Sequence, residues 1–179
     1  MSLVTVHDKT FKPFLSETEI QTAVKKIGNA ITTDYKGKKP LFIGVLNGAF
    51  MFCSDLLKSV DTTCEVTFVR LSSYDGMEST GEVRNVINLQ ENVAGRDLIL
   101  VEDIVDTGLT MQKALEYFGT LGPNSIEIAS LLVKPDCLKC KLDIKYTGFE
   151  IPEKFVVGYG LDYDGHGRNL KDIYQLKQD

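Results

Sequence analysis

Histidine and cysteine, the side chains that most often build metal sites, are scarce in this sequence. It has two histidines and four cysteines among 179 residues. Cys137 and Cys140 form a C-x-x-C pair, which is typical of half a zinc site or of a redox pair. A closed zinc site needs four ligands, and His7 and His166 are far from this pair in the sequence. Reduced, incidental thiols are therefore the better interpretation.

Long apolar runs and excess positive charge are also missing. No segment approaches the roughly 18 apolar residues of a membrane span, and residues 1–12 contain no apolar stretch of signal-peptide length. We therefore expect a cytoplasmic protein with no membrane contact. The formal net charge of -5 disfavours a nucleic-acid partner. A phosphate ligand would need backbone donors, a few placed cations or a metal ion.

The composition is that of a globular chain, with 43% hydrophobic and 25% charged residues. The length suits one hydrophobic core, so we expect a single domain over residues 1–179. Residues 16–19 form a capping box followed by apolar residues at helical spacing, which predicts a helix ending before Lys36. Further helices are expected over residues 49–58 and from Gly108 to residue 119 or 122, and strands over residues 41–46, 65–71, 86–89, 97–102, 126–133 and 155–157. This alternation predicts an α/β fold with a mostly parallel sheet, helices on both faces and a ligand site at the carboxyl ends of the strands.

Residues 98–110 are the most informative segment. They place a buried strand and two carboxylates before a small, hydroxyl-rich turn that opens a helix. Free backbone N–H groups and the helix dipole make such a turn an anion site. Thr107 and Thr110 add hydroxyl donors, and Gly108 permits close approach. A phosphate monoester fits this turn.

The acidic residues of this segment allow more than one interpretation. Glu102 and Asp103 suit ribose hydroxyls or a bound magnesium ion. Asp106 or Thr107 could instead simply cap the helix, with the acidic pair solvated. Asp-Thr-Gly also occurs in aspartic proteases, but those enzymes need two carboxylates sharing a proton in a largely β fold, whereas this triplet opens a helix.

Residues 98–110 resemble the binding signature for phosphoribosyl pyrophosphate (PRPP) of the type I phosphoribosyltransferases. Further segments resemble the hypoxanthine-guanine branch of that family, in order along nearly the whole chain: residues 71–74 with 79–81, residues 131–134, and residues 148–159 with 161–163. The signature alone is moderately specific, but the segments in this order are highly specific. The resemblance implies a parallel sheet flanked by helices with a small base-binding hood. It also implies Mg²⁺-dependent purine salvage, in which hypoxanthine or guanine and PRPP give IMP or GMP and pyrophosphate, and a homodimer or homotetramer.

The resemblance also implies roles for the acidic residues and the turn. Asp106 is the candidate general base, because a carboxylate beside the purine N7 makes N9 more nucleophilic. Glu102 and Asp103 would fix the ribose, directly or through Mg²⁺, and favour the positive charge that develops on it. The 5′-phosphate would bind at Asp106, Thr107, Gly108, Leu109 and Thr110.

The purine would be held by residues near the end of the chain. Lys134 would donate to the 6-oxo group, although a lysine after a strand is often only solvated. Phe155 would stack on the purine and Val156 would offer backbone groups, with Phe155 as plain core the alternative. Asp162 would help bind the base and hold Mg²⁺, and Arg168 would clamp pyrophosphate. Both could instead be surface residues of a loop.

Two further segments complete the implied site. Ser73 and Tyr74 belong to a loop expected over residues 72–84, which would act as a mobile lid or be merely disordered. Asn47 and Gly48 match a pyrophosphate-binding turn that has a non-proline cis peptide in the family. Many members carry lysine where this chain has Asn47, which puts PRPP affinity in question.

Two rival functions remain open at this point. One is a xanthine-preferring relative, since residue identities do not rank hypoxanthine, guanine and xanthine. The other is a regulatory protein that binds PRPP and acts on RNA or DNA. The net charge of -5 and the base pocket around Lys134 and Phe155 speak against the regulator.

Overall fold

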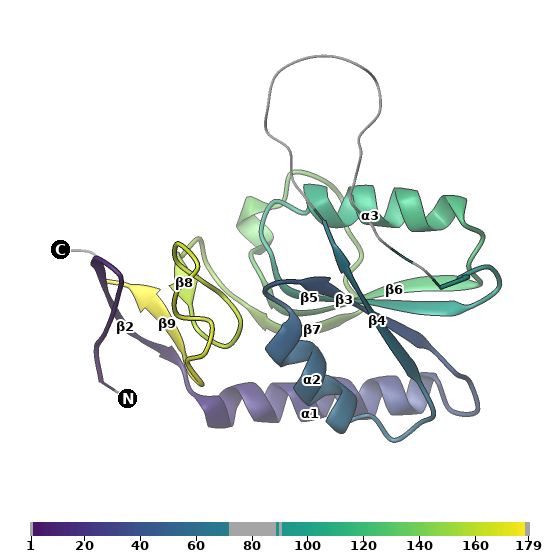
Figure 1. Ribbon diagram of the computed structural model, residues 1–179, viewed down its shortest axis with the longest axis horizontal. Coiled ribbons are helices and arrows are strands. Elements are labelled where there is room, and N and C mark those ends of the chain that lie inside the picture. Colours follow the sequence, from purple (N-terminus) through teal and green to yellow (C-terminus); the bar gives the residue numbers. More distant parts are fainter. Residues whose placement is uncertain (1, 72–88, 90, 178–179) are drawn as a thin grey trace, which may run out of the picture.

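The computed structural model describes residues 2–71, 89 and 91–177. Its centre is a five-stranded parallel sheet in the order β4-β3-β5-β6-β7 (Figure 1). The strands are β3 Leu41–Leu46, β4 Glu65–Arg70, β5 Asp97–Val105, β6 Ser125–Val133 and β7 Tyr146–Glu150. The helices are α1 Glu17–Asp34, α2 Phe50–Lys58 and α3 Leu109–Thr120, with a short 3-10 helix η1 at Pro135–Cys137. The α/β fold expected from the sequence is confirmed.

Helices cover both faces of this sheet, with α1 and α2 on one side and α3 on the other (Figure 1). In α1 the capping box is present, because the Ser16 hydroxyl accepts from the Glu19 N–H and the Glu19 carboxylate accepts from the Ser16 N–H. Apolar residues one helical turn apart then pack on strands β3, β5 and β6. A separate cluster joins α3 to the other face. The central strands β3, β5 and β6 are therefore buried on both sides, as their long apolar runs predict, whereas the edge strand β4 is largely exposed.

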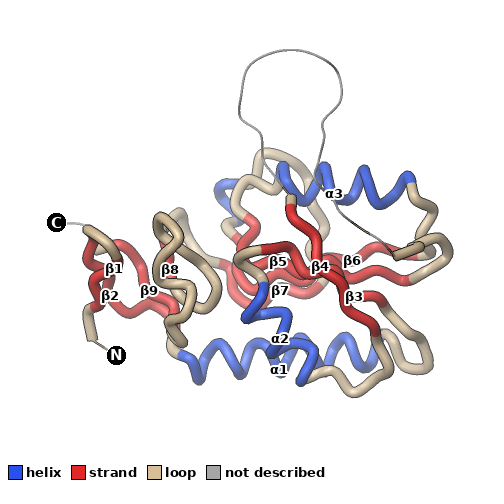
Figure 2. The backbone as a smooth tube through the Cα atoms, in the orientation of Figure 1, coloured by secondary structure: helices blue, strands red, loops and turns tan. Residues whose placement is uncertain are grey.

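A second, antiparallel sheet lies beside the first and joins the two ends of the chain (Figure 2). Its order is β1-β2-β9-β8, with β1 Val4–Val6, β2 Lys9–Leu15, β8 Val156–Val157 and β9 Ile173–Leu176. The predicted strand at residues 155–157 was expected to extend the alternating α/β pattern. It belongs to this small sheet instead, because Val156 and Val157 pair with β9 rather than with β7. This sheet occupies the place of the expected hood.

The end of one strand differs from the sequence-based expectation. Strand β5 was expected to end at Glu102 but runs on to Val105. Of the strand expected at residues 86–89, only Leu89 is described, and it lies in no strand. The loop expected at residues 72–84 lies outside the described residues. Among the described helices, none combines the length and apolar character needed to cross a membrane.

Candidate functional site

The turn between β5 and α3 leaves the helix N-terminus open. Gly108 is the N-cap residue with φ 79°, and no side chain makes a capping hydrogen bond there. The alternative in which Asp106 or Thr107 caps the helix is therefore wrong. The segment after β6 packs against the back of the turn, where Lys139 N donates to Thr107 O at 2.9 Å. The first N–H groups of α3 are thus held in place without a side-chain partner, as an anion site requires.

Asp106 and Lys134 meet at the carboxyl ends of adjacent strands. Lys134 Nζ lies 2.6 Å from Asp106 Oδ2. The lysine side chain is only 10% exposed, while that of the aspartate is 49% exposed. Lys134 is also fixed by its backbone, because its N–H donates to Val105 O at 2.9 Å. The interpretation of Lys134 as a solvated strand end is therefore wrong.

The acidic pair lies within β5, at an irregularity of the strand. Val101 and Ile104 both pack on the side of α1 and α2, so the alternation of faces shifts by one residue between them. The pairing of β5 with β6 likewise skips Asp103. This shift allows Glu102 and Asp103 to interact although they are neighbours in a strand.

Both members of the acidic pair are buried. Burial raises the pKa of Glu102 well above its usual range, and the hydrogen bond and negative charge of Asp103 raise that pKa further. Asp103 Oδ1 accepts from Ile104 N at 2.9 Å. Two buried carboxyl groups in contact favour a proton, a hydroxyl group or a cation beside them.

The turn after β3 lies directly over Asp103. The Leu46–Asn47 peptide bond is cis, as the family resemblance implied. A Cβ atom on Gly48 would overlap the Asp103 carboxylate, and one on Gly160 would overlap the Gly48 carbonyl. Glycine at both positions therefore lets the turn lie between the acidic pair of the sheet and the loop that follows β8.

Arg168 and Asp162 lie in the loop that follows β8 and pair with each other. Arg168 Nη2 is 2.7 Å from Asp162 Oδ1, and Arg168 Nη1 donates to Gly160 O at 2.7 Å. The second oxygen of Asp162 accepts from Gly165 N at 2.7 Å. Both side chains are partly buried and engaged, so they are not simply solvated surface charges. Through Gly160, this pair adjoins the turn at Gly48.

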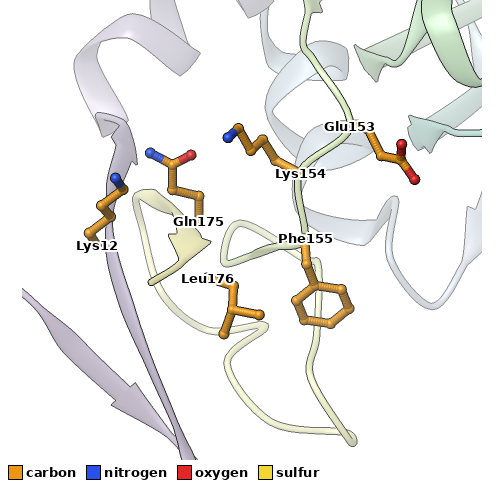
Figure 3. A pocket seen from close by; sticks show the side chains of 6 residues that line it. All are labelled: Lys12, Glu153, Lys154, Phe155, Gln175 and Leu176. Atoms are coloured by element: carbon orange, nitrogen blue, oxygen red, sulfur yellow. The ribbon is translucent and has the colours of Figure 1, made fainter. Parts of the chain in front are cut away.

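Phe155 is not a core residue, because it is 48% exposed. Its ring meets that of Tyr163 edge-on, with 5.8 Å between centroids. Its carbonyl accepts from Leu176 N at 2.9 Å, and the next residue, Val156, is buried. Figure 3 shows the pocket of about 290 Å³ that it lines, with the Phe155 ring and Leu176 at one end and the polar ends of Lys12, Lys154 and Gln175 at the other.

A tyrosine missed by the sequence analysis ties the small sheet to the helices. Tyr159 donates its hydroxyl proton to Asp55 Oδ2 at 2.6 Å, and the same oxygen accepts from Gln21 Nε2 at 2.6 Å. Burial raises the pKa of Tyr159, and the hydrogen bond to Asp55 raises it further. A tyrosine in a predicted pocket segment is typical of base stacking as well as of such an anchor, so no pattern in the sequence could have identified this contact.

The structure brings most of the predicted residues to one edge of the sheet. Ser73 and Tyr74 lie outside the described residues. Arg70, which the sequence analysis did not single out, ends β4 and donates from Nη2 to Asn47 Oδ1 at 3.0 Å. Among the described residues, no three His, Cys, Asp or Glu side chains converge as metal ligands.

Comparisons with known proteins agree with this geometry. A family model described as "Phosphoribosyl transferase domain" matches residues 15–164. The hypoxanthine-guanine phosphoribosyltransferase of Bacillus subtilis is 45% identical over 167 residues, which are 93% of this chain and 93% of that protein. The enzyme of that name from Staphylococcus aureus strain Mu50 is 42% identical and covers 96% of this chain and 97% of its own. A crystal structure of a hypoxanthine phosphoribosyltransferase from Staphylococcus aureus has a TM-score of 0.87 at 42% identity, over 93% of this chain and 91% of that one.

Proposed function

This chain belongs to the phosphoribosyl transferase family, and from that premise we propose that it transfers the 5-phosphoribosyl group of PRPP to hypoxanthine or guanine in purine salvage. The products are IMP or GMP and pyrophosphate. The single observation that carries the proposal is the 2.6 Å contact of Lys134 with Asp106 beside the open N-terminus of α3. It supplies a base-binding donor and a proton acceptor next to a phosphate site.

The 5′-phosphate of PRPP binds at the start of α3 in this proposal. Its ligands are the N–H groups from Asp106 to Thr110 and the hydroxyls of Thr107 and Thr110. The absence of a side-chain cap at Gly108 supports this assignment, because a capping oxygen would compete with the phosphate for the same donors. The dipole of α3 favours the negative charge.

The purine is held between the two sheets. Lys134 donates to the 6-oxo group, Phe155 stacks on the ring, and Val156 offers its backbone to the base edge. Asp106 accepts the N7 proton as N9 attacks the anomeric carbon. The exposed ring of Phe155 supports the stacking role, because an aromatic face is available there.

The ribose is oriented by Glu102 and Asp103. Pyrophosphate leaves as positive charge develops on the sugar, and carboxylates favour that charge. The raised pKa of Glu102 supports this role. Burial destabilises the ionised form of this carboxyl group, so a positive charge that develops beside it stabilises that form strongly. Asn47, Gly48 and Arg168 contact the departing pyrophosphate.

The donor set fits Mg²⁺. Magnesium is usually bound by one or two carboxylates together with substrate phosphates and water, and the described residues supply a carboxylate pair without a third converging ligand. Glu102 and Asp103 would hold it on the ribose side. Asp162 would do so on the pyrophosphate side, once one of its oxygens is released from Arg168 or Gly165. When bound, Mg²⁺ offsets the negative charge of the pyrophosphate.

Several parts of the proposal extend beyond the site. A homodimer or homotetramer, a cytoplasmic location and the lack of a nucleic-acid partner stay predictions. The xanthine-preferring relative and the regulatory PRPP-binding protein are the alternatives. The buried Lys134 favours the enzyme over the regulator, because a buried donor beside a proton acceptor serves a base and not a nucleic-acid backbone.

The test is nucleotide formation from PRPP and Mg²⁺ with hypoxanthine, guanine, xanthine, adenine and orotate offered separately. Turnover with hypoxanthine or guanine and none with adenine or orotate is expected. A strong preference for xanthine would replace the assignment with that of the xanthine-preferring relative. No turnover with any of the five bases, in folded protein that still binds PRPP, would favour the regulatory protein. A filter-binding titration with RNA and DNA at low salt would then detect its nucleic-acid binding.

A further inference from the structure

Arg70 ends the edge strand of the parallel sheet, beside the turn at Asn47. In the register of β3 and β4 it lies opposite Leu46, the residue just before that turn. Its Nη2 donates to Asn47 Oδ1 at 3.0 Å, which fixes one corner of the guanidinium at the turn. The guanidinium therefore lies at the carboxyl end of the strands, where ligands bind in folds of this class.

The charge around this turn is unbalanced. Beneath Gly48 lies the carboxylate of Asp103. Arg168, the other arginine near the turn, is already paired with Asp162 at 2.7 Å. In the described part of the chain Arg70 makes no ion pair, and its hydrogen bond to Asn47 goes to a neutral oxygen. Arg70 is thus the cation at this turn whose charge no described carboxylate offsets.

We propose that Arg70 binds the pyrophosphate group of PRPP at the Asn47–Gly48 turn, with Asn47 holding the guanidinium in position. The inference rests on the proposed function. A guanidinium carries five N–H donors in a plane that matches two phosphate oxygens, and Asn47 uses one of them. The remaining donors bind the phosphate, and the positive charge offsets the repulsion from Asp103 and from a chain of net charge -5.

This role gives Asn47 a function that its neutral side chain alone would not supply. The family resemblance implies a lysine at this position in many members, whereas here the charge comes from the neighbouring strand. The amide of Asn47 accepts from Arg70 through its oxygen, and its NH₂ group remains a donor. Arg70 is exposed, so its replacement leaves the hydrophobic core intact.

The experiment compares Arg70→Gln with wild type in two measurements. The first is the KM for PRPP and for hypoxanthine, and the second is calorimetric binding of pyrophosphate with Mg²⁺. Loss of a charged hydrogen bond to phosphate should raise the PRPP KM and the pyrophosphate Kd by about 10- to 100-fold. The KM for hypoxanthine should change less than about twofold. Arg70→Lys keeps a point charge, so its PRPP KM and pyrophosphate Kd should lie between those of wild type and Arg70→Gln.

The matched control is Arg96→Gln. Arg96 Nη2 lies 2.9 Å from Oε1 of Glu65. Glu65 begins β4 and Arg70 ends it, so this ion pair lies at the end of the strand away from the turn. Both PRPP KM and pyrophosphate Kd should stay at the wild-type values. The double variant Asn47→Lys with Arg70→Gln returns a cation to the turn and should recover most of the lost affinity.

Unchanged PRPP KM and pyrophosphate Kd in Arg70→Gln would overturn the inference. If Arg70→Gln does not fold, as judged by circular dichroism, Asn47→Ala serves instead, because it releases the guanidinium and should weaken pyrophosphate several-fold; an unchanged Kd there would overturn the inference too. Failure of the proposed function is distinct. Wild type without turnover on any purine would refute that function, and the pyrophosphate titration would still decide the role of Arg70.

Discussion

Lys134 Nζ lies 2.6 Å from Asp106 Oδ2, so the two groups that the proposal places on the 6-oxo group and N7 of the purine contact each other in the protein. The lysine is buried and the aspartate is half exposed. A purine that reaches Lys134 must therefore enter beside this pair and share or replace its contact. In the proposed function, base binding and base activation are therefore coupled at one ion pair.

Replacement of the proton acceptor tests this coupling first. Asp106→Asn keeps the shape of the side chain but removes its basicity, and turnover should fall by about 10²- to 10⁴-fold, as for loss of a general base. IMP binding, measured by calorimetry, should stay within several-fold of wild type. Asp136→Asn, an exposed aspartate in η1, is the control and should leave turnover unchanged. Full turnover of Asp106→Asn would remove this residue from its role.

The lysine of the pair should control base choice. Lys134→Gln removes a charged donor, so the KM for hypoxanthine and guanine should rise by about 10- to 100-fold. The ratio of kcat/KM for hypoxanthine to that for adenine should fall, because this discrimination depends on a donor facing the 6-position of the purine. Lys139→Gln, an exposed lysine five positions along the chain, is the control. Unchanged discrimination between hypoxanthine and adenine would contradict the assignment of Lys134 to the 6-oxo group.

The centre of the parallel sheet could be predicted from the sequence because β3, β5 and β6 are long apolar runs, whereas the short edge strand β7 at Tyr146–Glu150 was not predicted. The small sheet could not. Its strand β8 has only two residues and β1 only three, too few to show a period. The pairing of β2 with β9 also joins residues 9–15 to residues 173–176, a contact that no local pattern encodes. Phe155 was therefore assigned to a strand, but only the family resemblance, which implied a small base-binding hood, pointed to a second unit, and the strand pairing within that unit was not predicted.

In the candidate site, too, local motifs could be predicted from the sequence and contacts between distant segments could not. The turn from Asp106 to Thr110 is a local motif, so the open N-terminus of α3 could be predicted from the sequence. Contacts of Arg70 with Asn47 and of Tyr159 with Asp55 depend on how separate elements pack, which residue identity does not specify. The structure also supplies the irregularity of β5 that lets Glu102 meet Asp103.

The acidic pair predicts a pH dependence of stability in the ligand-free protein. Above the ordinary pKa of 4.5, the Glu102 carboxyl keeps its proton in the folded state and loses it in the unfolded chain. The free energy of unfolding should therefore fall as the pH rises from 4.5 through the raised pKa. Glu102→Gln has no such proton to lose, so its free energy of unfolding should lack this part of the fall and should exceed that of wild type increasingly as the pH rises. Its turnover should be reduced.

The measurement is urea unfolding of both proteins at a series of pH values above 4.5, where the unfolded chain has lost the proton that Glu102 keeps in the folded state. Glu116→Gln is the control, because Glu116 is an exposed residue of α3. It should follow the wild-type curve. A Glu102→Gln variant that parallels wild type at every pH would show that this carboxyl titrates normally.

The anchor between Tyr159 and Asp55 should hold the loop that contains Asp162 and Arg168. Tyr159 is 2% exposed, and its hydroxyl is 2.6 Å from Asp55 Oδ2. Tyr159→Phe leaves the ring in place and removes one hydrogen bond to a charged acceptor, which should lower the free energy of unfolding by about 1.5–3 kcal/mol. Tyr117→Phe is the control, because no described group hydrogen-bonds to that hydroxyl.

A purely structural role for Tyr159 would lower stability and leave kinetics unchanged. Because Gly160 contacts Gly48 and accepts from Arg168, a loosened anchor should also raise the PRPP KM several-fold. Kinetics measured well below the unfolding midpoint separate the two effects. An unchanged PRPP KM alongside the loss of stability would show that the loop at Asp162 and Arg168 keeps its position without this tyrosine.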